Sequence, residues 1–205
     1  MLRLHVARGT VAVAPHIALE EAGAEYTLNW IDFTRGDQTH PDYLAVNPKG
    51  RVPALETPHG VLTEAAAILT YIADTHPAAS LMPADPFQRA RVHELHLTLA
   101  ATVHVNHAHK LRGSRWANDP AAHTAMAAKV PQNMTANAAL LQDHFLTGPW
   151  VLGDAFSTAD IYLFTVARWF AGDGVDMSAF PALTVHHTAM MQRSAVQNVM
   201  RHHIS

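Results

Sequence analysis

The N-terminal part of the chain switches between two-residue and helical hydrophobic periods. Leu2, Leu4 and Val6 alternate with polar residues, which predicts a strand with one buried face. In Val11–Gly23 the apolar positions repeat at helical spacing, and Tyr26–Asp32 returns to a strand pattern. A strand, a helix and a strand in such a short stretch predict a right-handed crossover and a parallel strand pair.

The next segment adds a hairpin and a further helix. A short helix is predicted at Pro41–Val46, and strands are predicted at Ala54–Thr57 and Val61–Thr63, on either side of a turn at residues 58–60. Helical spacing then begins abruptly at Glu64. The predicted order is βαβ-α-ββα, with a four-stranded mixed sheet.

A proline-rich segment separates this part from a purely helical one. Pro77, Pro83 and Pro86 lie close together and read as a linker. We therefore predict an α/β domain at residues 1–76, a linker at 77–86 and an all-helical domain at 87–205. Helices are expected at 87–112, at 120–145 with a kink or break at Pro131, at 161–170, and in two closing segments.

One helix start in the second part has a complete local signature. Ser157 is placed as an N-cap and Asp160 stands at the third helical position, which is a capping box in acidic form. Phe156 and Ile161 are placed as a hydrophobic staple. We expect these residues to be structural rather than catalytic.

Composition and charge exclude several classes of protein. The net charge is -3 with histidine neutral, and no dense Lys/Arg cluster indicates nucleic-acid binding. No apolar run approaches a membrane span, and Met1–Val6 reads as a strand rather than a signal peptide, so we expect a cytoplasmic protein. The chain has no cysteine, which excludes disulfides, thiolate metal sites and a protein sulfur nucleophile.

Histidine, in contrast, is abundant, with 16 copies, and several form a stripe on the long helix at 87–112. A metal site, a pH-sensitive interface and a polar wall all remain possible explanations of the stripe. Residues 92–96 do not complete a metal signature, so no metal is expected. The stripe comprises His93, His96, Ala100, His104, His107 and Leu111.

Two motifs in the middle of the first part, NPKGRVPAL from Asn47 and LTEAAAILTYIAD from Leu62, resemble the glutathione transferase superfamily, and within it the bacterial beta-class enzymes. The resemblance implies a thioredoxin-like domain followed by an all-helical domain. It implies a cis Val52–Pro53 bond, with the Val52 backbone pairing with the cysteinyl backbone of glutathione. It also implies that Glu64 and Ala65 hold the γ-glutamyl end, and that Val11 and Arg51 belong to the same site.

The resemblance further implies the acceptor side of the site and the assembly. His104 matches a family histidine that faces the active-site cleft, although a hydrogen-bonded wall residue is an equal alternative. Phe33 and Trp169 are expected to line the pocket for a small hydrophobic electrophile, with core packing as the alternative for Trp169. Glutathione is expected as co-substrate, and the protein is expected to be a homodimer.

Two departures from the beta-class pattern leave the function open. Val11 stands where these enzymes have a cysteine, and Leu97 stands where they have an asparagine that reaches glutathione across the dimer. One hypothesis is a transferase in which Thr10, or failing it the Val11 or Ala12 amide, stabilises the glutathione thiolate, although Thr10 also suits a helix cap. The other is a non-catalytic ligand-binding or protein-interaction module with the same fold.

Overall fold

The computed structural model describes residues 1–203, and these form two compact units. The first unit contains Met1–Ala84 together with the C-terminal residues from Met191 onward, and the second contains Asp85–Met190. The sequence predicted that the helical domain runs to residue 205, whereas the C-terminal helix packs with the first unit.

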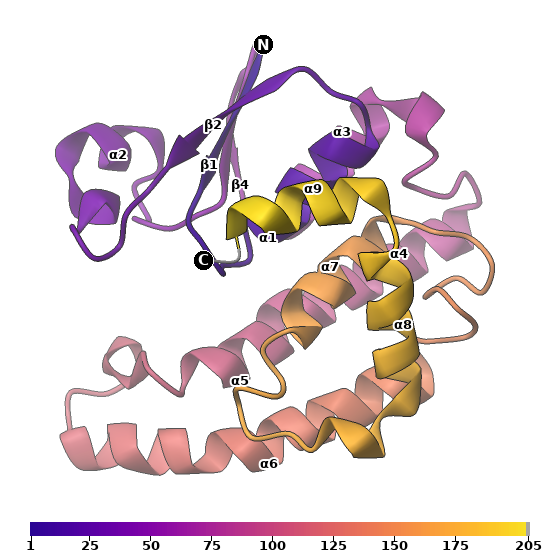
Figure 1. Cartoon of the computed structure of the whole chain (residues 1–205). Coiled ribbons are helices and arrows are strands. Elements are labelled where there is room, and N and C mark those ends of the chain that lie inside the picture. Colours follow the sequence, from indigo (N-terminus) through magenta and orange to yellow (C-terminus); the bar gives the residue numbers. More distant parts are fainter. Residues whose placement is uncertain (204–205) are drawn as a thin grey trace. The chain divides into compact units, whose positions relative to one another are not determined.

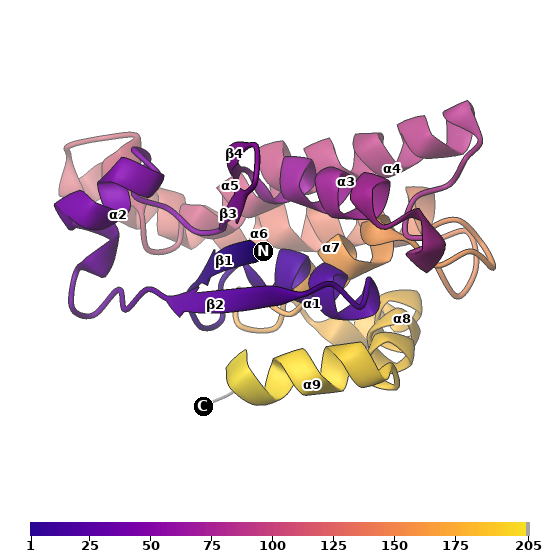
Figure 2. The same cartoon turned by 90° about the horizontal axis from the view of Figure 1, so that it is seen from above.

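The first unit is built on a four-stranded mixed sheet in the order β2-β1-β3-β4, which confirms the prediction. Strand β1 (Leu2–Val6) pairs in parallel with β2 (Tyr26–Trp30). On its other side β1 pairs antiparallel with β3 (Ala54–Thr57), which in turn pairs antiparallel with β4 (Gly60–Thr63). Figure 2 shows the strands following one another in this order.

Among residues 1–203, four α-helices accompany the sheet in the first unit. Helix α1 (Val13–Glu21) is buried along most of its length because β1, α3 (Ala65–Thr75) and α9 (Ser194–His203) all pack against it. Figure 1 shows α9, in yellow, lying alongside α1. The short α2 (Pro41–Val46) connects β2 to β3.

Two polar contacts hold α9 on α1. The guanidinium of Arg193 donates to both carboxylate oxygens of Glu21, at 2.6 and 2.8 Å. The buried imidazole of His16 shares a hydrogen bond of 3.0 Å with His203. These contacts join residues that are far apart in the sequence, so no local pattern predicts them.

The second unit is helical throughout its regular structure. Helix α7 (Thr158–Ala167) is buried from Thr158 to Val166, which confirms the prediction of a central apolar helix. Helix α6 runs through Pro131 without being split. The other helical segments are α4 (Pro86–Thr98), the π-turn η3 (Leu99–Val103), α5 (His104–Ala108), η4 (Gly113–Arg115), α6 (Pro120–His144), η5 (Met177–Ala179) and α8 (Pro181–Met191).

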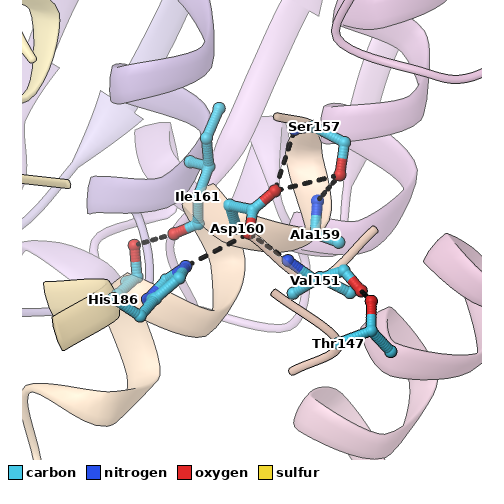
Figure 3. Close-up of polar contacts among 8 residues, drawn as sticks. Thr147, Val151, Ser157, Ala159, Asp160, Ile161 and His186 are labelled. Atoms are coloured by element: carbon cyan, nitrogen blue, oxygen red, sulfur yellow. Dashed lines mark hydrogen bonds and ion pairs between the residues drawn. The ribbon is translucent and has the colours of Figure 1, made fainter. Parts of the chain in front are cut away.

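The predicted capping box at the start of α7 is present, and it is part of a larger buried network (Figure 3). One carboxylate oxygen of Asp160 accepts from the Ser157 N–H at 2.9 Å. The other accepts from the Val151 N–H at 2.8 Å and contacts His186 Nε2 at 3.2 Å. Asp160 therefore ties the preceding turn and α8 to α7, in agreement with a structural role.

The long helix expected at 87–112 is interrupted, and this corrects the prediction of one continuous histidine stripe. The π-turn η3 contains an extra residue relative to an α-helical turn, so the helix face that follows it is rotated by about 100°. His96, before the turn, is buried with its ring against Tyr162. His107, after it, lies against Trp169. A uniform helical period cannot reveal such an insertion.

Across residues 1–203, no helix combines the length and the apolar character that crossing a membrane requires.

Candidate functional site

The predicted glutathione residues of the first unit gather at one end of the sheet. In the strand register Ala54, at the start of β3, lies opposite His5, near the end of β1, and also opposite Thr63, at the end of β4. The segments that follow β1, precede β3 and follow β4 therefore meet at the same sheet end. They contain Thr10, Val11, Arg51, Val52, Pro53, Glu64 and Ala65.

The loop before β3 is held firmly by buried polar groups. The Tyr43 hydroxyl and the Asn47 side-chain amide both donate to the carbonyl oxygen of Arg51, at 2.7 and 2.6 Å. Gly50 has a φ of 59°, and a Cβ there would lie 2.9 Å from the Gln38 carbonyl oxygen, so only glycine fits. These two hydrogen bonds fix the carbonyl group of Arg51, which directly precedes Val52.

The next residue, Val52, has a main-chain N–H and C=O that take part in no hydrogen bond within the described residues. The Val52–Pro53 bond is cis, as predicted. Within residues 1–203, neither the N–H nor the C=O of Val52 is hydrogen-bonded to another protein group. Main-chain groups in folded proteins are nearly always paired. A donor and an acceptor on one residue fit the backbone of an extended peptide ligand.

Glu64, between β4 and α3, adopts an unusual backbone conformation. Its φ of 73° is rare for a residue with a side chain and costs about 1 to 3 kcal/mol, and such conformations cluster at ligand sites. The exposed carboxylate pairs with Lys49 Nζ, which also donates to the Thr63 hydroxyl at 2.8 Å. Ala65 opens α3, whose first N–H groups have no helical acceptor. The turn between β4 and α3 therefore offers the Glu64 carboxylate as an anion and the first N–H groups of α3 as hydrogen-bond donors.

The segment before α1 offers a second set of donors. The Thr10 hydroxyl donates to the Ala7 carbonyl oxygen at 2.8 Å and accepts from the Ala12 N–H at 3.3 Å. Its one hydrogen is therefore engaged within the turn. The Val11 N–H donates to no acceptor in the described part of the chain, and Val11 directly precedes Ala12, the N-cap of α1, where partial positive charge collects.

The predicted acceptor residues lie in both units. Phe33, in the loop after β2, belongs to the first unit and its side chain is partly exposed. His104 and Trp169 belong to the second unit, where their ring centroids are 5.0 Å apart. His104 and Trp169 are therefore neighbours within one unit, and the roles expected of them stay predictions.

Three polar residues beside the predicted site residues had no predicted role. They are Lys49, His107 and Asp173. Lys49 lies within the NPKG motif, but only the fold brings it to Glu64. His107 was grouped with the stripe, and Asp173 had no assignment, yet their side chains are 2.6 Å apart. A lysine inside a recognised motif was a usable signal, whereas the pairing of His107 with Asp173 had none in the sequence. Among residues 1–203, no three histidine, aspartate or glutamate side chains are grouped closely enough to hold a metal ion.

Comparison with known proteins agrees with the fold. The family model for the glutathione S-transferase N-terminal domain matches residues 2–74, and that for the C-terminal domain matches residues 120–189. Glutathione S-transferase GstA of Escherichia coli O157:H7 is 31% identical over 202 residues, which is 97% of each chain.

Solved structures agree over the whole chain as well. A glutathione transferase homologue from Sulfitobacter with bound glutathione has a TM-score of 0.97 and 46% identity, and the match covers 100% of this chain and 99% of the other. A beta-class glutathione S-transferase from Sphingomonas chungbukensis has a TM-score of 0.80 and 35% identity, with 98% of each chain covered.

The sheet order and the cis proline before β3 define the first unit as a thioredoxin-like domain. With its helical second unit and these relatives, the chain belongs to the glutathione S-transferase family.

Proposed function

We propose that this protein is a glutathione transferase that conjugates the thiol of glutathione to small hydrophobic electrophiles. The observation that carries the proposal is the unpaired main chain of Val52, which lies at the same sheet end as Glu64 and the start of α1. An extended tripeptide with a charged γ-glutamyl end needs these groups: a main-chain donor and acceptor, a carboxylate and a helix start.

In this proposal the cysteinyl backbone of glutathione pairs with Val52. The γ-glutamyl ammonium pairs with Glu64, while its carboxylate accepts from N–H groups at the Ala65 end of α3. Lys49, which holds the Glu64 carboxylate, lies beside the same end of the ligand. Arg51, Pro53 and Val11 shape the rest of the site.

The thiol would be activated without a protein nucleophile. Lowering a thiol pKa of about 8.5 by two units requires about 2.7 kcal/mol. A helix start contributes up to about 2 kcal/mol when partly buried, and a hydrogen bond to a charged group about 1.5 to 3 kcal/mol. The free Val11 N–H is suited to be the first donor, and the Thr10 hydroxyl joins it by exchanging its bond to Ala7.

The roles expected of His104 in orienting or protonating the acceptor, and of Phe33 and Trp169 in contacting it, stay predictions. The homodimer and the cytoplasmic location expected from the sequence stay predictions.

A second candidate is a glutathione-binding module without catalysis. Val11 replaces the reactive cysteine with a buried apolar side chain, and Leu97, in place of the asparagine, has 64% of its surface exposed. Binding of glutathione without conjugation of any electrophile would favour this candidate over the transferase.

Replacing Glu64 by glutamine is expected to weaken glutathione binding by about tenfold or more, because a hydrogen bond to a charged group is lost. Folding stability is expected to change little, since the Glu64 carboxylate is 65% exposed and exposed ion pairs contribute little. Isothermal titration calorimetry of wild type and variant with glutathione measures the effect.

Glu94→Gln is the matched control for this experiment. Glu94 forms a similar exposed ion pair, with Arg91, but lies in α4 of the second unit, so its loss is expected to leave glutathione affinity unchanged. Equal affinities of the Glu64→Gln variant and wild type would remove Glu64 from the site, and no binding by wild type at millimolar glutathione would reject the proposed function.

Replacing Thr10 by valine is expected to lower the conjugation rate about tenfold, the equivalent of about 1.4 kcal/mol of transition-state stabilisation. Valine matches threonine in shape but removes the hydroxyl that holds Ala7 and Ala12. Thr10→Ser keeps the hydroxyl and is expected to retain most of the rate. If Thr10→Val changes neither the rate nor its pH profile, the main-chain amides alone activate the thiol.

A further inference from the structure

One guanidinium of the second unit has no carboxylate partner. Arg168 is the C-cap residue of α7, and its side chain is half-buried. Its Nη1 atom is shielded from solvent, and within residues 1–203 this guanidinium takes part in no hydrogen bond or ion pair. Burial lowers the pKa of Arg168. Because charges in protein interiors are normally paired, the unpaired charge of Arg168 is unusual.

A histidine of α8 approaches the same place. The Cζ atom of Arg168 lies 6.0 Å from the centre of the buried Phe164 ring, and the centre of the His187 ring lies 5.1 Å from it. The pKa of His187 is lowered by burial first, and then by the positive charges of Arg168 and His186. The second unit therefore brings two basic side chains together over one aromatic ring.

The carboxylate of Asp160 does not neutralise this pair. Asp160 contacts the neighbouring His186 at 3.2 Å (Figure 3), and its two oxygens also accept from main-chain N–H groups. Its ion pair is formed with His186 and not with Arg168 or His187. Among the described residues, no acidic side chain forms an ion pair with either of these two basic groups.

Helix capping is the alternative role for Arg168. A cation at the C-terminal end of a helix is stabilised by the helix dipole, and an arginine there often donates to the last carbonyl groups. The Arg168 guanidinium donates to no carbonyl group of the described residues, and it lies over Phe164, one turn earlier. A second basic group beside it, His187, does not serve capping, but it suits a site for an anion.

We propose that Arg168 and His187 form a binding site for a doubly charged oxyanion, either free phosphate or sulfate or the terminal phosphate of a larger ligand. The planar guanidinium presents paired N–H donors that match two oxygens of such a group. His187 adds a donor and takes up a proton when the anion binds, because a nearby negative charge raises the pKa of a histidine. Both residues belong to the second unit and have no role in the proposed thiol chemistry, so the site is independent of the transferase function.

Isothermal titration calorimetry with sodium sulfate, at constant ionic strength, tests this site. Wild type is expected to bind sulfate saturably, and Arg168→Gln is expected to bind it about tenfold more weakly or worse, because a hydrogen bond to a charged group is lost. Arg91→Gln is the matched control. Arg91 also lies over an aromatic ring, with Cζ 5.2 Å from the centre of Phe145, but its charge is paired with Glu94, so sulfate affinity is expected to be unchanged.

The pH dependence of sulfate binding reports on His187. Sulfate keeps its double charge between pH 5.5 and pH 7.5, so a change in affinity over this range comes from the protein. Wild type is expected to bind sulfate more tightly as the pH falls, because the bound anion stabilises protonated His187. His187→Gln is expected to lose most of this dependence.

Thermal unfolding distinguishes binding from the general effect of sulfate. Sulfate stabilises proteins by being excluded from their surface, and this part of the rise in Tm is expected in wild type and Arg168→Gln alike. A larger rise in wild type indicates binding. Equal rises, or no saturable binding of sulfate or phosphate by wild type, would overturn the site and leave the transferase function intact.

A final comparison identifies the source of the anion. Phenyl phosphate that binds more tightly than inorganic phosphate, and depends on Arg168 in the same way, would indicate the terminal group of a larger ligand, whereas equal affinities would indicate the free ion. Binding that Arg168→Gln leaves unchanged would reject the site for either source. Circular dichroism checks the fold of each variant, and if Arg168→Gln does not fold, the pH dependence in His187→Gln decides.

Discussion

The Asp160→Ala variant is expected to lose about 3 to 5 kcal/mol of unfolding free energy. The Asp160 side chain is fully buried, and its removal leaves the N–H groups of Val151 and Ser157 without acceptors. His186 loses its partner as well. Because this network joins α7 to the preceding turn and to α8 (Figure 3), the whole second unit is expected to be destabilised. Urea unfolding followed by circular dichroism measures the change.

An exposed helix cap provides the matched control for this effect. Asp85 caps α4 by accepting from the Gln88 N–H at 2.8 Å, but its surroundings are open to solvent. Asp85→Ala is expected to cost only about 1 kcal/mol, as is usual for an N-cap. If Asp160→Ala costs no more than Asp85→Ala, the buried network contributes nothing beyond ordinary capping.

Stability is also expected to fall steeply between about pH 6.5 and pH 4. Burial, helped by the nearby His202, lowers the pKa of His16 from 6.5 to about 4. Burial likewise lowers the pKa of His96 to about 4. The unfolded chain binds more protons than the native state in this window, so stability is complete above pH 6.5 and is lost as the pH falls toward 4. Each histidine accounts for about 3 kcal/mol.

Urea unfolding at pH 7.5 and pH 4.5 tests this prediction. His96→Phe keeps an aromatic ring against Tyr162 but cannot be protonated, so the difference between the two pH values is expected to shrink by about 3 kcal/mol. His59→Gln, a change in the exposed turn between β3 and β4, is expected to keep the wild-type difference. An unchanged difference in His96→Phe would show that His96 is not a source of acid sensitivity.

Much of the first unit was predictable because it depends on short-range patterns. The alternation in β1 and the helical period of α1 follow from which side chains share a face, and these periods are visible in adjacent residues. The cis Val52–Pro53 bond and the corner at Glu64 were predictable from the motifs that contain them. The roles assigned to Thr10 and His104 stay predictions.

The capping box at the start of α7 was also predictable from a short-range pattern. Ser157 and Asp160 are three positions apart, so their reciprocal hydrogen bonds form wherever a helix begins there. What the sequence could not indicate is that Asp160 also accepts from Val151 and contacts His186, because these partners depend on how α8 and the preceding turn pack.

The sequence by itself determined the order of elements, the mixed sheet, the apolar central helix and the absence of a protein thiol, since each follows from composition or from neighbours within a few residues. The tertiary structure alone decided the docking of α9 on α1 through His16 and His203, the rotation of the histidines by η3, and the pairing of His107 with Asp173. Those features arise from contacts between distant segments, or from one inserted helical residue, which hydrophobic periodicity does not encode.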